Sequence, residues 1–509
     1  MSSNNLAKST IWLIVSEIIF NLSGYIIHSF VGRVLGPADY GRYGLVVTLT
    51  TMVIILIGNG IPTAMAKYIS EVFETNPRMV LVIKKKAIFL QSILIGTITV
   101  VFFFASPLIS MALGDETLTP LFRISTLIIP AFAAASFYFS YYTGLHKFNV
   151  QSILKTMRSL LKVVAIMGLA YAFKVPGSIV GYAVAAFSVF MIAFTMDQLI
   201  YTKEIKKAAK EQNLSLASDF ETKKLVNYAW QVILFFLAYE LLISIDLYLV
   251  KGILHDDRLT GIYNAALTVG RIPYYIFYAL TIMLLPVISK STSEQDHKQT
   301  NAVIGQSLRI MTILLIPSVV LLSQFASPVI KLFYSSKYID AAYPMSILSY
   351  GVGFLTIFYV MSFVLNGAGK TKIPMWLSIF GVILNTILNY ILIKQSGLAG
   401  SAIATTITSF VVMLGILYYI KRDFGVLIEL KSLLKMLLAG IVMFFASRFF
   451  SQGEFIFLIW SAALMSLYLF ILILLREITM QDFNYLKNII SKKKKTELQE
   501  ELSGNEPSA

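Results

Sequence analysis

The sequence predicts an all-α integral membrane protein with about 14 transmembrane helices, on two observations. Of its 509 residues, 57% are hydrophobic and only 14% are charged, and the mean hydropathy is +0.75. Soluble domains are about half apolar and about a quarter charged. The apolar residues also gather into segments of about 20, the length that crosses a bilayer. These values exclude a soluble enzyme, a disordered chain and a collagen-like chain.

The apolar segments follow one another with short polar breaks. They cover residues 10–31, 43–64, 87–109, 121–143, 150–173, 178–201, 226–250, 261–287, 304–325, 343–365, 373–393, 398–420, 433–450 and 455–475. Fourteen helices of about 21 residues would take up about 58% of the chain, which agrees with the hydrophobic fraction. Nearly the whole protein is therefore expected to lie in the bilayer.

The distribution of basic residues predicts the orientation of these segments. With both termini in the cytoplasm, cytoplasmic regions hold 28 of the 42 Lys and Arg, external loops hold nine, and five lie inside segments. Cytoplasmic loops are enriched in Lys and Arg, and an odd number of helices would destroy this bias. We predict a multi-pass protein of the cell (cytoplasmic) membrane. The net charge of +15 then reflects topology, and no nucleic-acid partner is expected.

Signatures of enzyme chemistry are absent from the sequence. The chain has no cysteine, which excludes disulfides, zinc–thiolate sites and iron–sulfur clusters. Its four histidines are scattered. Residues 367–371 superficially resemble a phosphate-binding loop, but Val364 occupies the place of the required first glycine. We therefore expect no enzyme activity, no cofactor and no metal.

Weak internal matches predict two similar halves. They lie 219 to 223 residues apart and include Gly41 with Gly261, Gly181 with Gly400, and Gly144 with Gly367. We predict six-helix halves at 1–222, which ends in a cytoplasmic linker at 202–222, and at 223–430. Residues 431–475 supply two further helices, and 476–509 form a cytoplasmic tail that is first amphipathic and basic, then disordered.

Three stretches of the sequence carry a family resemblance. They are VGRVLGPADYGRYG at 31–44, AKYISE at 66–71, and Asp246 followed by GIYNAA at 261–266. Together with 14 helices in two halves, they resemble the polysaccharide-transporter family of Wzx-type O-antigen flippases. This family lies in the multidrug/oligosaccharidyl-lipid/polysaccharide exporter superfamily.

The resemblance implies a function and partners. A Wzx-type protein flips a polyprenyl-pyrophosphate-linked oligosaccharide from the cytoplasmic to the outer leaflet for surface polysaccharide assembly. The implied mechanism is alternating access by rocking of the two halves. Expected partners are the lipid-linked oligosaccharide, membrane lipids, a polysaccharide polymerase and glycosyltransferases.

A polar stripe in the segment 261–287 is the first candidate substrate site. It consists of Asn264, Thr268, Arg271, Tyr275 and Tyr278, at helical spacing. An ionised residue at mid-membrane costs at least about 2.5–3.5 kcal/mol, so Arg271 should face a cavity or a partner. Facing a cavity, the stripe would offer a phosphate cation and aromatic rings for sugars. A packed polar seam inside the C-terminal half is the alternative.

Further cations are candidates for the same head group. Lys155, Arg158 and Lys162 share one face of their segment and could guide pyrophosphate inward from the cytoplasm. Arg123 lies near the external start of its segment. Snorkelling to the membrane surface is the alternative for Arg123 and Lys155, and lipid-phosphate contact for Arg158.

Embedded acids are candidates for ion coupling or for counter-ions. Glu17 lies in the first segment, and Glu240 and Asp246 lie in the seventh, its repeat equivalent. Both segments should border the cleft between the halves. The alternative is structural pairing, for instance of Asp246 with Lys251.

Glycine and proline mark candidate hinges for alternating access. They are Gly36, Pro37 and Gly41 in an external turn, and Gly58, Gly60 and Pro62 inside the second segment. Such breaks let helices bend while neighbouring groups satisfy the backbone. Plain kinks would leave the same pattern.

Two other functions remain open from the sequence. A cation-coupled multidrug exporter of the same architecture would need an acidic cavity for cationic drugs. This chain instead has more Lys and Arg than acids inside its apolar segments. An integral-membrane glycosyltransferase or polysaccharide polymerase would need a large external loop, and the predicted external loops are short.

Overall fold

The computed structural model describes residues 3–73, 75–211, 220–450, 453 and 455–478, which form helices and no strand. The helices are α1 Ser3–Asn59, α2 Ile61–Val72, α3 Pro77–Ala112, α4 Thr119–Ser125, α5 Ile128–Gly144, α6 Phe148–Met196, α7 Thr202–Glu211, α8 Thr222–Leu254, α9 Asp257–Gly270, α10 Ile272–Ser293, α11 His297–Gln324, α12 Ala326–Phe333, α13 Ala342–Gly367, α14 Lys372–Phe424, α15 Leu430–Ser447 and α16 Ile456–Leu474. The predicted amphipathic and disordered tail lies outside the described residues from 479 onward.

Three of the longest helices fold back on themselves. α1 turns at Gly36, α6 at Lys174 and α14 at Gly397, where the backbone leaves the helical region. Across the turn at Gly36, the Nδ1 of His28 lies 2.9 Å from the hydroxyl oxygen of Tyr40. In a straight helix 12 residues would separate them by about 18 Å. Each of these helices is therefore a pair of antiparallel arms.

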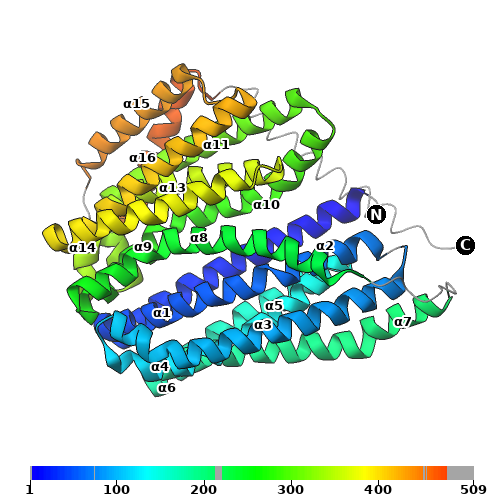
Figure 1. Cartoon of the computed structure of the whole chain (residues 1–509). Coiled ribbons are helices and arrows are strands. Elements are labelled where there is room, and N and C mark those ends of the chain that lie inside the picture. The colour runs from blue at the N-terminus through cyan, green and yellow to red at the C-terminus, as the bar shows by residue number, and fades with distance from the viewer. Residues whose placement is uncertain (1–2, 74, 212–219, 451–452, 454, 479–509) are drawn as a thin grey trace, which may run out of the picture.

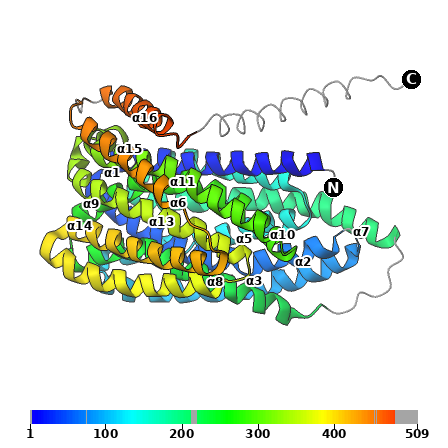
Figure 2. The same ribbon diagram turned by 90° about the horizontal axis from the view of Figure 1, so that it is seen from above.

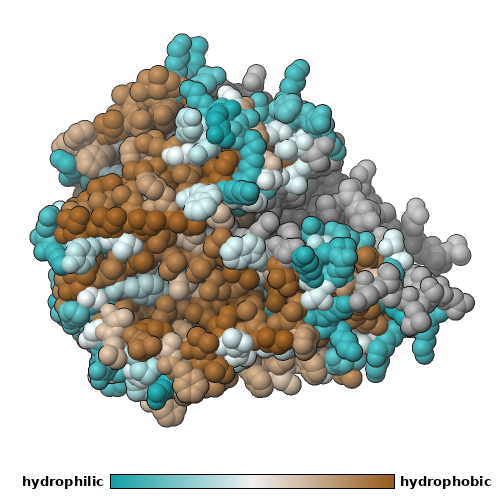
Figure 3. Space-filling view, viewed as in Figure 1, coloured by the Kyte–Doolittle hydropathy of each residue, from teal (hydrophilic) through white to brown (hydrophobic). Residues whose placement is uncertain are grey.

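The all-α membrane fold is confirmed. Within the described part of the chain, nine helical stretches are long and apolar enough to cross a bilayer, and they include the three folded helices. Figure 3 shows a broad hydrophobic surface over the helices, with hydrophilic residues gathered toward the two ends. Large hydrophobic side chains such as Phe104, which is 72% exposed, lie on the outside of the protein. Such a surface suits contact with lipid, and the number of 14 spans stays a prediction.

The helices gather in chain order (Figures 1 and 2). α1 to α7 lie on one side of the molecule, α10 to α14 on the other, and α8 runs along the boundary between them. α15 packs on α11 and α16 packs on α15, so the last two helices lie outside the second group. Below, the N-terminal half means residues 1–222 and the C-terminal half means residues 223–430, as the sequence predicts them.

Positive φ angles occur at matching places in the two halves. The pairs are Gly36 with His255, His146 with Gly369, and Lys174 with Gly397, at offsets of 219, 223 and 223. Lys174 (φ 51°, ψ −131°) and Gly397 (φ 55°, ψ −130°) share almost one conformation. This region favours glycine because it has no Cβ.

One of the sequence matches needs correction. Gly400 corresponds to Gly177, not to Gly181, because each follows its turn residue by three positions. A Cβ on Gly177 would overlap the carbonyl of Leu169, and one on Gly400 that of Leu392, both eight residues earlier. Close packing of the two arms therefore requires glycine at both places.

Another matched pair joins the halves directly. A Cβ on Gly41 would overlap the carbonyl oxygen of Asp257 and the backbone nitrogen of Gly261. A Cβ on Gly261 would overlap the carbonyl of Pro37. The two helices thus touch backbone to backbone at equivalent residues, which is expected near an axis that relates two repeats.

Candidate functional site

A cavity of about 410 Å³ lies between the two halves. Its walls come from α1, α5 and α6 on one side and from α8, α9, α10 and α13 on the other. This size falls within the range of about 300–1,000 Å³ that is common for small-ligand sites. The predicted site residues on its walls are Glu17, Arg158, Lys162, Glu240, Asn264, Thr268, Arg271 and Tyr275.

The N-terminal wall is a row of cations on the first arm of α6. Lys155, Arg158 and Lys162 lie on one helical face because their spacings are three and four. Lys155 forms an ion pair with Glu17 of α1, and its ammonium also lies 5.3 Å from the ring centre of Phe20. Its charge is therefore compensated inside the protein.

Arg158 is buried, and no acid of the described residues lies within ion-pair distance of it, although Glu17 interacts with it electrostatically. Its side chain is 6% exposed, and its guanidinium carbon lies 4.2 Å and 4.6 Å from the ring centres of Phe132 and Phe139. Its Nη1 atom is buried and donates no hydrogen bond to any described residue. A buried unsatisfied donor on a charged group costs about 1–3 kcal/mol or more.

Lys162 lies one turn deeper in the same wall. It is also 6% exposed, and its ammonium lies 4.7 Å from the ring centre of Phe20 and 5.1 Å from that of Tyr182. Among the described residues it has no acid within ion-pair distance. Aromatic rings stabilise such cations by about 0.5–2 kcal/mol, less than a carboxylate would inside a protein.

The C-terminal wall places Arg271 at a helix break. The predicted segment 261–287 is interrupted there, because α9 ends at Gly270 and α10 begins at Ile272. Pro273 has no N–H to continue the hydrogen-bond ladder. The guanidinium donates to the carbonyl oxygen of Ile243 and interacts electrostatically with Glu240 and Asp246. Its charge therefore interacts with two acids, whereas Arg158 interacts with Glu17, which already pairs with Lys155.

Tyrosine rings line the space between these charges. Tyr25 of α1 meets Tyr275 of α10 edge to face, with 6.1 Å between ring centres, across the two halves. Tyr359 lies 4.7 Å and 4.9 Å from the ring centres of Tyr239 and Tyr274. The side-chain amide nitrogen of Asn264 is buried and unbonded among the described residues. The wall is therefore largely aromatic.

Asp246 does not line the cavity but sits behind its C-terminal wall. Its carboxylate is buried and accepts hydrogen bonds from the hydroxyls of Tyr263 at 3.0 Å and Thr405 at 3.2 Å. It also accepts from the backbone N–H of Leu247 at 2.9 Å. The alternative of an Asp246–Lys251 pair is wrong, because Lys251 pairs with other acids.

Two amides extend this polar cluster. Asn389 donates to the Oδ1 of Asn385 at 2.7 Å and accepts from the hydroxyl of Ser401 at 2.6 Å. Sequence reasoning missed these residues. Two asparagines four apart in the segment 373–393, followed by Ser401 and Thr405, were the signal that could have revealed them.

Two predicted site residues fall outside this arrangement. Arg123 is exposed, with its guanidinium carbon 5.2 Å from the ring centre of Phe103, and does not belong to the cavity wall. The side chain of Tyr278 lies outside the described residues, although its backbone belongs to α10.

A layer of hydrogen bonds closes one end of the cavity. His28, on the wall, bonds Tyr40, and the hydroxyl of Tyr40 lies 2.8 Å from that of Tyr334 in the other half. The Tyr338 hydroxyl donates to the carbonyl oxygen of Gly32 at 2.7 Å. The halves are thus joined at the end where α1 folds back.

Ion pairs reinforce this closed end. Arg42 binds Asp257 at 2.8 Å, and Lys251 binds Asp115 at 2.9 Å as well as Asp257. The pairs Arg42–Asp257 and Lys251–Asp115 each cross between the halves. Burial acts to raise the pKa of Asp115, but hydrogen bonds from Thr117 and Lys251 outweigh it and hold that pKa below its usual value.

The predicted hinge residues lie at two places. Gly36 and Pro37 form the turn of α1 at the closed end, and Gly41 meets Gly261 there. The second set interrupts the following arm, because α1 ends before Gly60 and α2 begins after it. Its other members are Gly58 and Pro62. Whether they bend during transport stays a prediction.

Comparisons with known proteins find a matching family and similar membrane proteins. The sequence profile described as "Polysaccharide biosynthesis protein" matches residues 6–292, and the profile "MatE" matches residues 232–391. The chain is 25% identical over 426 residues to membrane protein MJ1375 of Methanocaldococcus jannaschii, covering 81% of this chain and 96% of that protein. It is 29% identical over 157 residues to "Lipid II flippase MurJ" of Bacillus subtilis, covering 30% and 29%.

A solved structure shares the fold over nearly the whole chain. The structure titled "Lipid II flippase MurJ, inward closed conformation" matches with a TM-score of 0.73 and 18% identity, covering 92% of this chain and 99% of that one.

Proposed function

Because the chain belongs to the polysaccharide biosynthesis family, in the multidrug/oligosaccharidyl-lipid/polysaccharide exporter superfamily, we propose that it flips a polyprenyl-pyrophosphate-linked oligosaccharide from the cytoplasmic to the outer leaflet. It is a membrane transporter of the flippase type and not an enzyme. The substrate assignment depends on one observation: Arg158 and Lys162 are buried on the cavity wall, and no acid of the described residues lies within ion-pair distance of either.

A pyrophosphate would supply the missing partner. Removing a cation from water costs several kcal/mol, which a nearby anion offsets only with good geometry and hydrogen bonds. The free Nη1 of Arg158 can donate to a phosphate oxygen, and Lys162 adds a second charge one turn away. Two adjacent cations suit two linked phosphates better than a single neutral sugar.

The remaining wall suits the oligosaccharide. Tyr25 and Tyr275 present aromatic rings from opposite halves, and Asn264 and Thr268 add polar side chains to the wall. Sugars and phosphates need a hydrated cavity, because each unsatisfied polar group costs several kcal/mol in hydrocarbon. The polyprenyl tail can stay among the lipids outside the helices.

The closed layer defines one state of an alternating-access cycle. With both termini in the cytoplasm, as the basic loops predict, the layer at Tyr40, Tyr334 and the ion pairs faces outward. The cavity is then accessible only from the cytoplasmic side. Release would require Arg42–Asp257 and Lys251–Asp115 to separate while the opposite ends of the halves approach.

The Asp246 cluster is the proposed place for coupling to an ion gradient. One carboxylate and several neutral side-chain oxygens meet there, a set that suits a proton or a small hard cation. A change of charge at Asp246 would act on the cavity wall through Arg271, because Arg271 interacts with both Asp246 and Glu240. Glu17 serves instead as counter-ion to Lys155.

A cation-coupled multidrug exporter is the second candidate. The MatE match covers the half that contains Glu240 and Asp246, which favours it. A cationic drug in this cavity would nevertheless face Arg158 and Lys162. The charge of the wall therefore favours an anionic substrate.

The test is head-group translocation in proteoliposomes. A fluorescent polyprenyl-pyrophosphate oligosaccharide would be followed for wild type, Arg158→Gln, Lys162→Gln and the double variant. We expect each single variant to lose at least about tenfold in rate, which corresponds to about 1.4 kcal/mol, and the double variant to be inactive.

Arg123→Gln is the matched control, because it removes an exposed cation away from the cavity, and it should keep the wild-type rate. A folded double variant that flips at the wild-type rate would disprove the assignment of the anion site. An inactive wild type that instead expels a cationic dye would favour drug export.

A further inference from the structure

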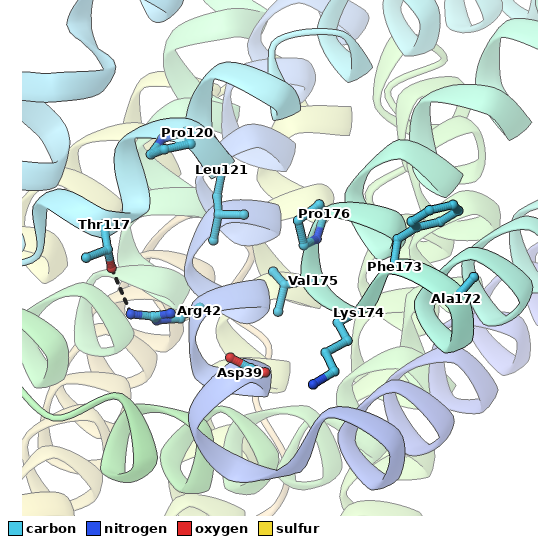
Figure 4. A pocket seen from close by; sticks show the side chains of 10 residues that line it. All are labelled: Asp39, Arg42, Thr117, Pro120, Leu121, Ala172, Phe173, Lys174, Val175 and Pro176. Carbon is cyan, nitrogen blue, oxygen red and sulfur yellow. Dashed lines mark hydrogen bonds between the residues drawn. The ribbon is translucent and has the colours of Figure 1, made fainter.

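A second recess lies at the closed end, away from the cavity. Its volume is about 470 Å³, and it lies between the turn of α1, the start of α4 and the turn of α6 (Figure 4). Three charged side chains line it: Asp39, Arg42 and Lys174. Leu121, Val175 and nearby prolines provide an apolar wall.

Two of these charges lack a partner in the part of the chain that the structure describes. Lys174 is exposed and Asp39 is half-buried, and neither forms an ion pair or side-chain hydrogen bond with a described residue. Figure 4 shows both side chains directed into the recess. Arg42 differs, because it already binds Asp257 at 2.8 Å and Thr117 at 2.7 Å.

The backbone at Lys174 is an independent observation. It adopts φ 51° and ψ −131°, a region that side chains disfavour, whereas the equivalent turn of the C-terminal half has Gly397 in the same conformation. Glycine would relieve the strain at no cost in packing. A lysine kept in a strained conformation, with its charge directed into a recess, indicates a role for the charge.

The surroundings place the recess at a membrane surface. Tyr171 and Phe173, at the end of the same arm of α6, are 80% and 64% exposed. Exposed aromatic residues at helix ends are typical of the boundary between lipid and water. A ligand at this level would reach the recess from the bilayer surface.

We propose that this recess binds the head group of an amine-bearing, zwitterionic phospholipid of the phosphoethanolamine type. Lys174, with Arg42 beside it, would hold the phosphate, and Asp39 would accept hydrogen bonds from the ammonium group. An anionic head group would meet the free carboxylate of Asp39. A simple cation would meet Lys174 and Arg42. Only a ligand with both charges satisfies both free groups.

Lipid retention by the purified full-length protein tests this proposal. Delipidated protein in detergent would be titrated with phosphatidylethanolamine, phosphatidylglycerol or phosphatidylcholine of equal chain length, and bound lipid counted by native mass spectrometry. We expect wild type to prefer phosphatidylethanolamine about tenfold over both others. Phosphatidylcholine has the same charges, but its quaternary ammonium has no N–H to donate to Asp39.

Three variants separate the contributions. Lys174→Gln should abolish the preference, and Lys174→Gly should do so while raising thermal stability, so that loss of binding cannot be attributed to unfolding. Asp39→Asn should reverse the preference toward phosphatidylglycerol. Lys394→Gln is the control, because Lys394 lies near the equivalent turn in the other half and its ammonium lies over the ring of Tyr390.

Equal retention of the three lipids by wild type, or an unchanged preference in Lys174→Gln, would overturn the proposal. A wild-type preference for phosphatidylglycerol would also overturn it and indicate a plain anion site. None of these measurements involves the lipid-linked oligosaccharide, so the outcome is independent of the proposed transport function.

Discussion

The N-terminal half contributes Lys155, Arg158 and Lys162 to the cavity with Glu17 as the acid beside them, whereas the C-terminal half contributes Arg271 between two acids. Among these residues, the first wall therefore has two more cations than acids, whereas the second has one more acid than cations. Both halves use the same turns and the same close approach of helix arms. The difference teaches that a repeated backbone can carry different charges, an excess of cations in one half and a cation with two acids in the other.

The largest effect should come from the glycines through which the halves touch. Gly41→Val and Gly261→Val each insert a side chain into opposing backbone, so we expect each to destabilise the protein by about 3 kcal/mol. Thermal unfolding in detergent measures this. If the two halves are equivalent at this contact, the two variants should lose similar amounts of unfolding free energy.

Gly96→Val is the control for both variants, because nothing lies within 4 Å of a Cβ there. It should change stability by less than about 0.5 kcal/mol. A tolerated Gly261→Val would show that the contact is not needed for folding and that the halves meet differently.

The ion pairs of the closed end should have the next largest effect. Lys251→Gln removes a 2% exposed cation from Asp115 and Asp257, and we expect the closed state to lose about 2 kcal/mol. Because the chain has no cysteine, spin labels at Ala38→Cys and Lys337→Cys, in opposite halves, can report the opening.

The comparison variant is Arg258→Gln. Its pair with Asp340 is exposed and lies within the C-terminal half, so its loss should cost less than about 1 kcal/mol and leave the label distance unchanged. An equal response of the two variants would contradict a special role for the pairs between the halves.

A smaller effect should come from the strained backbone of Lys174, in the turn of α6, compared with the unstrained left-handed backbone of His255 after α8. Lys174→Gly should stabilise the protein by about 1 kcal/mol, because it relieves a conformation that Gly397 adopts freely in the other half. His255→Gly should change stability by no more than about 0.5 kcal/mol, because His255 is in the ordinary left-handed region (φ 52°, ψ 30°). Chemical denaturation would compare the two, and a destabilised Lys174→Gly would show that the turn is not strained.

The smallest effect should be that of pH on the closed end. Since the pKa of Asp115 is depressed in the folded protein, its stabilising contribution is complete above the ordinary carboxyl value of about 4 and is lost as pH falls through the lower folded value. The label distance should therefore be constant between pH 5 and 8 and increase only below about pH 4. Asp115→Asn should remove this response to acid. An increase of the label distance already near pH 6 would show that another group controls the opening.

Much of the site could be predicted from the free-energy cost of placing a charge inside a membrane. Charged residues in apolar segments must face a cavity or a partner, and Arg271, Arg158 and Lys162 do line one cavity. The pairing of each charge could not be predicted, because it depends on which helix faces which. Lys155 meets Glu17 across 138 positions of sequence.

The sequence by itself determined the membrane fold, because the length and hydropathy of a spanning helix are local properties. It also indicated a repeat, although only the backbone angles corrected the register from Gly181 to Gly177. The tertiary structure alone decided which of the described cations form ion pairs, where the halves are closed, and that Lys174 and Asp39 share a recess. These depend on distances between remote segments, since the energy of a buried charge is determined by its nearest neighbours in space.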